Sequence, residues 1–196
     1  MLPCVVTPSS MPRRAGDARE TCAHPAAAPP LRRGRAATNL RCIGHRRRRP
    51  QLDGYAWAHD LEGMDLDELS HLYRVAPLGE KPPAALATVF GNSMFRCFVR
   101  ADGALVGAGR ALADGLDCAY IADVAVHPDH QGRGLGRAII RRLVDLAQGH
   151  RKIILYANPG TEGFYTRLGF LRMNTAMAIW SDPARAVESG LLRADP

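Results

Sequence analysis

A glycine-rich turn, Gln131-Gly132-Arg133-Gly134-Leu135-Gly136, offers the clearest chemistry in the sequence. An apolar stretch ends just before it at His127-Pro128, and a long helix is expected to follow to about Gly149. The first turn of a helix has unpaired N–H groups and a partial positive charge, and both favour an anion. Arg133 and Arg137 add charge, so the pattern favours a phosphate or pyrophosphate ligand. A plain glycine-rich connection is the open alternative.

Two other nucleotide-binding motifs do not fit this turn. A P-loop requires G-x-x-x-x-G-K-[ST], and the chain contains neither Lys-Ser nor Lys-Thr. A Rossmann unit places its glycine turn after the first strand of a parallel sheet. Here the turn follows three expected strands, 94–100, 104–112 and 118–126. The turns Asp102-Gly103 and Asp114-Gly115 join them, so they should pair as an antiparallel meander.

The remaining elements must position this turn. We expect a short strand at 54–59, helices at 65–76 and 82–91, a strand at 152–157, a helix at 161–168 and a final strand at 170–180. The resulting order is β-α-α-β-β-β-α-β-α-β. The prediction is one α/β (α+β) domain over residues 53–182, with a mixed, mostly antiparallel sheet and helices on both faces. A short tail, residues 183–196, follows.

The positive charge of the chain belongs to its first quarter. The 196 residues have a net charge of +7, yet residues 1–50 hold 11 Lys and Arg against 2 Asp and Glu. This Arg-, Pro- and Ala-rich stretch lacks a periodic apolar pattern, so residues 1–52 are predicted to be a disordered extension. Three explanations stay open: a non-structural extension or a start assigned too far upstream, an organelle transit peptide, and a tether for nucleic acid or an anionic surface.

Cysteine usage and hydropathy exclude further classes. The five cysteines form no C-x-x-C pair, so neither a disulfide framework nor structural zinc is expected. No apolar run approaches the ~20 residues that span a bilayer. A reducing, cytoplasmic location fits best, with organelle targeting by residues 1–50 as the alternative.

Two blocks resemble the GNAT superfamily of N-acetyltransferases. Residues 123–136 resemble its acyl-CoA-binding signature, Gln/Arg-x-x-Gly-x-Gly/Ala after an apolar strand, with Gln131, Gly134 and Gly136 at the fixed positions. Residues 163–170, Gly-Phe-Tyr-Thr-Arg-Leu-Gly-Phe, resemble its closing Phe-Tyr-x-x-x-Gly-Phe segment. The resemblance covers about residues 54–181. It implies the GNAT fold and the transfer of an acetyl group from acetyl-CoA to a primary amine by direct attack, with no metal.

The resemblance also implies roles for single residues. The backbone of the fourth strand would bind the pantetheine arm, the glycine turn would bind the pyrophosphate, and Asn158 would contact the cofactor. Tyr165 would be the general acid that protonates the leaving thiolate, with core packing as its alternative role. The implied cofactor-binding set is Val124, Ala125, Val126, Gln131, Gly132, Arg133, Gly134, Leu135, Gly136, Arg137, Asn158 and Tyr165.

Other candidate residues keep more than one interpretation. Asp123, a lone carboxylate in an apolar strand, is a candidate catalytic base, a contact for a cationic amine, or a structural acid bonded to neighbouring amides. Tyr120 would relay water or pack. His127 and His130 share a metal-like spacing, but Pro128 argues against a metal site.

The acceptor amine is not encoded in any motif. Trp57, Phe90 and Phe95 would line an acceptor pocket or pack in the core. A small-molecule acceptor is favoured, and a homodimer is open. The alternative functions are a CoA-binding sensor or pseudoenzyme, and a nucleic-acid-associated protein acting through the basic arm.

Overall fold

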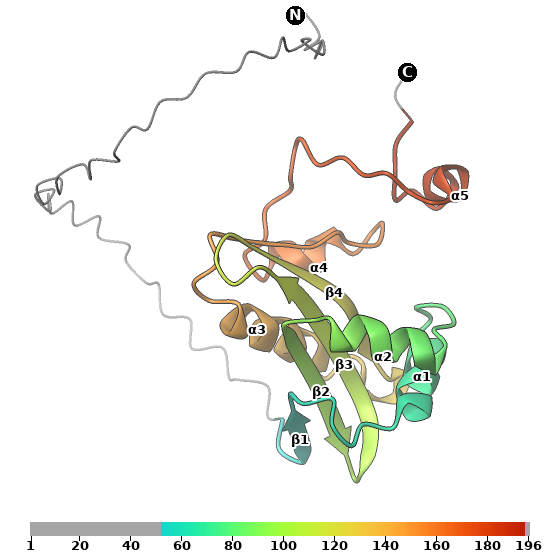
Figure 1. Ribbon diagram of the computed structural model, residues 1–196, viewed down its shortest axis with the longest axis vertical. Coiled ribbons are helices and arrows are strands. Elements are labelled where there is room, and N and C mark those ends of the chain that lie inside the picture. The colour runs from blue at the N-terminus through green and yellow to red at the C-terminus, as the bar shows by residue number, and fades with distance from the viewer. Residues whose placement is uncertain (1–51, 195–196) are drawn as a thin grey trace, which may run out of the picture. The chain divides into compact units, whose positions relative to one another are not determined.

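A computed structural model describes residues 52–194 (Figure 1). The basic stretch 1–50 and its expected disorder lie outside the described residues. The elements follow in the order β1 (Tyr55–Ala58), α1 (Leu66–Val75), α2 (Pro83–Gly91), β2 (Phe95–Ala101), β3 (Ala104–Ala113), β4 (Cys118–Val126), η1 (Pro128–His130), α3 (Leu135–Leu146), β5 (Lys152–Ile154), α4 (Glu162–Thr166) and α5 (Pro183–Glu188). The expected order is therefore confirmed from the first strand through α4, with η1 as a short addition.

The described residues form one five-stranded sheet in the order β1-β2-β3-β4-β5. Neighbouring strands from β1 to β4 pair antiparallel, and β4 pairs with β5 in parallel. The expected Asp-Gly turn joins β2 to β3, with φ of +49° at Asp102 and +83° at Gly103. Both residues adopt the positive φ that tight hairpins require, which explains why the meander was readable from the sequence.

Helices cover both faces of the sheet, as predicted (Figure 1). On one face, α1 and α2 bury Leu69, Leu72, Tyr73, Leu86 and Phe90 against the sheet residues Phe98, Leu105, Ala108 and Ala125. On the other face, α3 buries Leu135, Ile139, Ile140 and Leu143 against Cys97, Val99, Val106, Ala111 and Ile121. These two apolar layers fix the start of α3 relative to the end of β4.

Two glycines let α3 lie close to the sheet. A Cβ atom at Gly107 would lie 2.9 Å from Ile139 Cδ1, and one at Gly109 would lie 2.8 Å from Ile139 Cγ2 and 3.1 Å from Leu143 Cδ1. Real side chains almost never approach so closely. The Gly-x-Gly pattern within β3 is therefore a packing feature under α3.

The predicted final strand, 170–180, is wrong. This segment forms no strand, and Leu171, Met177 and Ile179 are 88%, 92% and 103% exposed. Apolar alternation yields a strand only where a face is covered and a neighbouring strand offers hydrogen-bonding groups. The neighbour here would be β5, which ends at Ile154 rather than at the expected residue 157.

The predicted C-terminal tail contains a helix that we did not expect, α5. Asp182 caps it by accepting the N–H of Arg185 at 3.0 Å, and Pro183 occupies its first position. An Asp-Pro pair is a known helix-start signal, so the sequence did contain the information.

Candidate active site

The site begins at an irregularity in β4. Ala125 pairs with Ala108 and Ala122 pairs with Arg110, so Asp123 and Val124 both lie opposite Gly109. This is a β-bulge, and Asp123 has a φ of +53°, which is unusual for a residue with a side chain. Bulges bend a strand and commonly occur beside active sites.

The pairing between β4 and β5 ends just before the bulge. Their parallel pairing covers Cys118–Tyr120 with Lys152–Ile154 and then stops. From Ile121 to Val126, β4 has no ladder partner in β5 among the described residues, so that edge of β4 is open.

The glycine turn follows β4 and η1 along the chain and leads directly into α3. Gly132 and Gly134 have φ values of +73° and +87°, and Gly134 is the N-cap of α3 with no side-chain capping bond. The side-chain amide of Gln131 donates to the carbonyl of Val126 at 3.0 Å and ties the turn to the strand. A Cβ atom at Gly132 would have no neighbour within 4 Å, so the turn is open on that side. The first amides of α3 are thus available to an anion.

The start of α3 also meets α4. A Cβ atom at Gly136 would lie 3.6 Å from Val126 Cγ2 and 4.0 Å from Phe164 Cζ. The structure therefore brings together Val126, the glycine turn and α4, which carries Tyr165. Asn158 is exposed in the loop before α4, and its carbonyl accepts hydrogen bonds from the N–H and hydroxyl of Thr161 at 3.0 and 2.6 Å.

Tyr165 is half-buried among aromatic rings. Its ring makes edge contacts with Phe164 and Phe170, at centroid distances of 5.0 and 6.1 Å. Burial raises the pKa of Tyr165 above its usual value of 10.0, so the phenol stays protonated at neutral pH. A protonated hydroxyl of this kind is a suitable proton donor to a thiolate.

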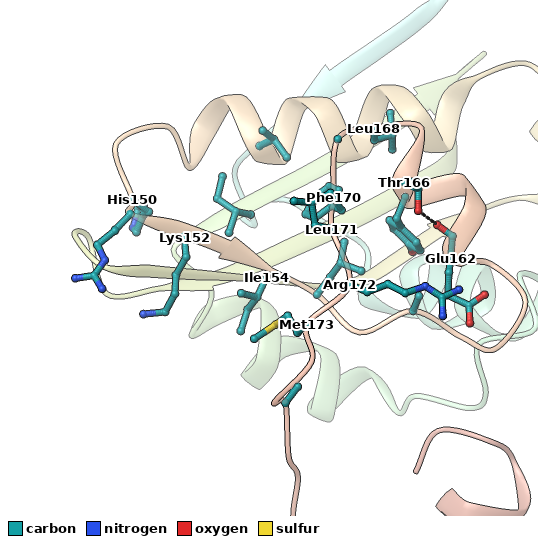
Figure 2. Close-up of a pocket in the computed structure, with 18 residues that line it drawn as sticks. His150, Lys152, Ile154, Glu162, Thr166, Leu168, Phe170, Leu171, Arg172 and Met173 are labelled. Atoms are coloured by element: carbon teal, nitrogen blue, oxygen red, sulfur yellow. Dashed lines mark hydrogen bonds between the residues drawn. The ribbon is translucent and has the colours of Figure 1, made fainter. Parts of the chain in front are cut away.

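Tyr165 also lines a cavity of about 770 Å³. Figure 2 shows this cavity between Lys152 and Ile154 of β5, Glu162 and Thr166 of α4, and the segment from Leu168 to Met173. It occupies the sheet edge at which the sixth strand was expected.

Asp123 is the centre of an ion-pair cluster. Lys81 Nζ donates to its Oδ1 at 2.7 Å and Arg110 Nε donates to its Oδ2 at 2.5 Å. Arg110 Nη1 also donates to the Ser93 hydroxyl at 3.2 Å. Burial alone would raise the pKa of Asp123, but the hydrogen bonds and charges of Lys81 and Arg110 outweigh burial and hold this pKa below the ordinary value.

The strained backbone of Asp123 is supported from α1. The hydroxyl of the fully buried Tyr73 donates to the Asp123 carbonyl at 2.6 Å, and Lys81 Nζ lies 5.2 Å from the centre of the Tyr73 ring. Sequence reasoning missed Lys81 and Arg110 as partners and considered amides instead. A single arginine within the apolar strand β3 was the available signal, since such a charge needs a buried counter-ion.

An aromatic cluster stands at the point where β4 and β5 separate. Tyr120 is the last residue of β4 that pairs with β5. Its ring stacks on Tyr156 at 6.1 Å, and Tyr156 contacts Trp180 edge-on at 5.6 Å. Tyr156 is 57% exposed, so the cluster has an open side. Burial, together with the nearby Tyr156 and Asp123, raises the pKa of Tyr120.

The other aromatic candidates lie elsewhere. Phe90 is fully buried in the α1–α2 layer and stacks on Phe98 at 5.3 Å. Trp57 and Phe95 pack at the margin of the α3 layer, against Arg142 and His150 respectively. The core interpretation therefore describes Phe90 and Phe95, and Trp57 is a partly buried residue at the β1 side of the α3 layer.

His127, His130 and Cys97 have ordinary structural surroundings. His130 Nδ1 hydrogen-bonds with the Tyr55 hydroxyl at 2.9 Å, and His127 Nδ1 accepts the N–H of Asp129 at 3.3 Å. Cys97 is buried, and burial raises the pKa of its thiol to about 12. Residues 52–194 contain no group of three His, Cys, Asp or Glu side chains that could hold a metal ion, and none of their helices is long and apolar enough to cross a bilayer.

The antiparallel meander, the strand bulge and the glycine turn that opens onto a helix together make an α/β arrangement in which helix N–H groups are open to an anion. Residues 64–170 match the model of the acetyltransferase (GNAT) family. The chain belongs to this family, and the match confirms the resemblance of its two sequence blocks.

Curated relatives and solved structures agree with this assignment. The chain is 31% identical over 122 residues to GCN5-related N-acetyltransferase 1, chloroplastic, of Arabidopsis thaliana, covering 60% of this chain and 62% of the relative. It is 51% identical over 67 residues to serotonin N-acetyltransferase 2, chloroplastic, of Oryza sativa subsp. japonica, covering 33% and 34%. A GNAT family acetyltransferase from Streptococcus pneumoniae TIGR4 has the same fold, with a TM-score of 0.57, 21% identity, and coverage of 64% of this chain and 96% of that one. The matches thus span less than two thirds of these curated relatives.

Proposed function

We propose that the protein transfers an acetyl group from acetyl-CoA to a primary amine of a small acceptor. The observation that carries this proposal is the open glycine turn at the start of α3, directly beside the unpaired edge of β4. The turn offers amides to a pyrophosphate, and the open edge offers backbone groups to an amide-containing chain such as pantetheine. The names of the relatives support the same activity.

The binding residues follow from this arrangement. The backbone of Val124, Ala125 and Val126 would bind the pantetheine arm, and residues Gln131 to Arg137 would bind the pyrophosphate. Asn158, exposed in the loop before α4, would contact the cofactor from its open side. Acetyl-CoA supplies the thioester, whose carbonyl carbon a neutral amine can attack directly.

Tyr165 would act as the general acid. When the tetrahedral intermediate collapses, the C–S bond breaks and the sulfur takes the electron pair. The Tyr165 hydroxyl would give its proton to that sulfur, the attacking nitrogen would lose its extra proton to solvent, and solvent would return a proton to the phenolate. Burial raises the pKa of Tyr165, so the phenol carries its proton at neutral pH, and its place on α4, which contacts the start of α3, supports this role.

Asp123 would position the site instead of removing the amine proton. Both of its oxygens accept hydrogen bonds from cations, and a carboxylate with a lowered pKa is a weak base. We propose that it joins Lys81, in the loop between α1 and α2, to Arg110 of β3 and so fixes the acceptor side of β4.

The aromatic cluster favours an acceptor with an aromatic ring. Tyr120, Tyr156 and Trp180 present ring faces and edges beside the proposed thioester position, and aromatic pairs contribute about 0.5–1.5 kcal/mol beyond area burial. The similarity to serotonin N-acetyltransferase 2 supports the same class. A relative named glucosamine 6-phosphate N-acetyltransferase 1, 38% identical over 63 residues, makes a phosphorylated amino sugar the second candidate.

A thiol-release screen tests the proposal. The purified chain is mixed with acetyl-CoA and serotonin, tryptamine, glucosamine 6-phosphate or polyamines, and free CoA is measured over time. We expect release with aromatic amines and none with Gly134→Asp, whose carboxylate would repel the pyrophosphate. CoA binding without release for any amine would contradict transfer and support the CoA-sensor alternative. Absence of CoA binding would overturn the site itself.

The location of the protein is a separate proposal. Two relatives have names that include "chloroplastic", and residues 1–50 are rich in arginine and poor in acidic residues. Both observations favour the organelle-targeting alternative over a cytoplasmic location. Residues 1–51 fused to a fluorescent protein should direct it to an organelle, and a diffuse cytosolic signal would contradict this.

A further inference from the structure

A second cleft lies on the side of α3 that faces β1. It has a volume of about 370 Å³ and is lined by Leu52, Trp57, Arg137, Ala138, Arg141, Arg142 and Asp145. β1 and β5 are at opposite edges of the sheet, so this cleft is separate from the open edge of β4 beside β5. We define these seven residues as the α3–β1 cleft.

The charges in the α3–β1 cleft are unbalanced. The lining of the cleft contains three guanidinium groups and one carboxylate. Within residues 52–194, none of the three guanidinium groups forms an ion pair or a side-chain hydrogen bond. The carboxylate of Asp145 instead accepts a hydrogen bond from Gln148 at 3.4 Å. Two arginines of the sheet are paired with carboxylates, Arg100 with Glu68 and Arg110 with Asp123. Like charges four residues apart on a helix, such as Arg137 and Arg141, destabilise it unless an anion lies between them.

The cleft also has an apolar wall. Arg142 lies over the Trp57 ring, with its guanidinium carbon 5.5 Å from the ring centre, and this contact holds the guanidinium in place. Leu52, Trp57 and Ala138 can contact a carbon skeleton, while the planar guanidinium groups match the oxygens of a phosphate. The volume lies near the lower end of the range for small-molecule sites, about 300–1,000 Å³.

From this geometry we infer that the α3–β1 cleft binds a small phosphorylated molecule. Arg141 and Arg142 hold the phosphate, and the Trp57 side contacts the remainder of the ligand. Arg137 also belongs to the proposed pyrophosphate site, so the inference rests on Arg141 and Arg142, whose side chains lie outside that site.

Tryptophan fluorescence gives a local readout. The chain has two tryptophans, so Trp180→Phe leaves Trp57 as the reporter inside the cleft. The full chain with this change is saturated with CoA, to fill the glycine turn, and titrated with AMP and separately with inorganic phosphate. We expect a saturable change in Trp57 emission, with AMP binding more tightly than phosphate because of the apolar wall.

Arginine variants decide the outcome. Arg141→Gln should raise the dissociation constant for AMP about tenfold, the loss of one charge-assisted hydrogen bond, and leave CoA affinity unchanged. Arg141→Lys should retain part of the affinity, and the matched control Arg185→Gln on α5 should retain all of it. The inference is overturned if Trp57 emission shows no saturable change, or if Arg141→Gln and the parent bind AMP equally.

Discussion

Replacing Asp123 by Asn removes the charge at the centre of the ion-pair cluster and keeps the side-chain volume. The carboxylate accepts two charge-assisted hydrogen bonds, each contributing about 1.5–3 kcal/mol. The Asp123, Arg110 and Lys81 side chains are 16%, 12% and 29% exposed, so water can partly solvate Lys81 but hardly Arg110. The Asn oxygen still accepts one bond. We therefore expect a loss of about 2–3 kcal/mol, less than the ~3–5 kcal/mol for a fully buried pair.

Urea unfolding at pH 7 measures this loss, which corresponds to a melting temperature lower by about 5–10 °C. The folded-state pKa of Asp123 is lowered, so its stabilisation is complete above the unfolded-state value of about 3.9 and disappears as pH falls through the folded-state pKa. The difference between the two proteins should stay constant from pH 7 to 5 and shrink below pH 4.

A double-mutant cycle with Lys81→Met isolates one of the two contacts. Lys81→Met alone should cost about 1 kcal/mol, because its ammonium is the more exposed partner. The combined variant should be more stable than the sum of the single losses predicts, by a coupling energy of about 0.5–1.5 kcal/mol. Strict additivity, or a loss below about 0.5 kcal/mol for Asp123→Asn at pH 7, would refute the role that we assign to the cluster.

Three further outcomes are expected. Tyr165→Phe should lower the rate of thiol release by about 10²-fold or more. Its CoA affinity, measured by calorimetry, and its stability, measured by urea titration, should stay unchanged. An unchanged rate of thiol release would remove Tyr165 from the mechanism. Gly109→Ala should cost about 1–3 kcal/mol because its Cβ would lie 2.8 Å from Ile139, whereas the control Gly91→Ala, with no neighbour within 4 Å, should be nearly neutral in thermal unfolding. A chain without residues 1–50 should keep its melting temperature and its thiol release, and an insoluble product would show that this stretch is structural.

Most of the fold was predictable because its signals are local. The Asp-Gly turn between β2 and β3 and the residue patterns that predicted β2 to β4 and α3 lie within short segments, and each agrees with the structure. The segment 170–180 has the same kind of local signal and still forms no strand. Strand formation depends on a neighbour, and the hydrogen-bonding edge of β5 is only three residues long.

The candidate site likewise has a part that local sequence specifies and a part that depends on contacts between distant segments. By itself, the sequence determined the glycine turn, because the end of β4, the turn and the first residues of α3 are contiguous, and the proposed anion site uses their backbone N–H groups. Only the tertiary structure decided the partners of Asp123, since Lys81 lies 42 residues away and Arg110 lies 13 residues away on the neighbouring strand. The same holds for Tyr120, Tyr156 and Trp180, which three separate segments bring together. Contacts of side chains across elements depend on strand register and on the bulge at Asp123, and no pattern within one segment specifies either.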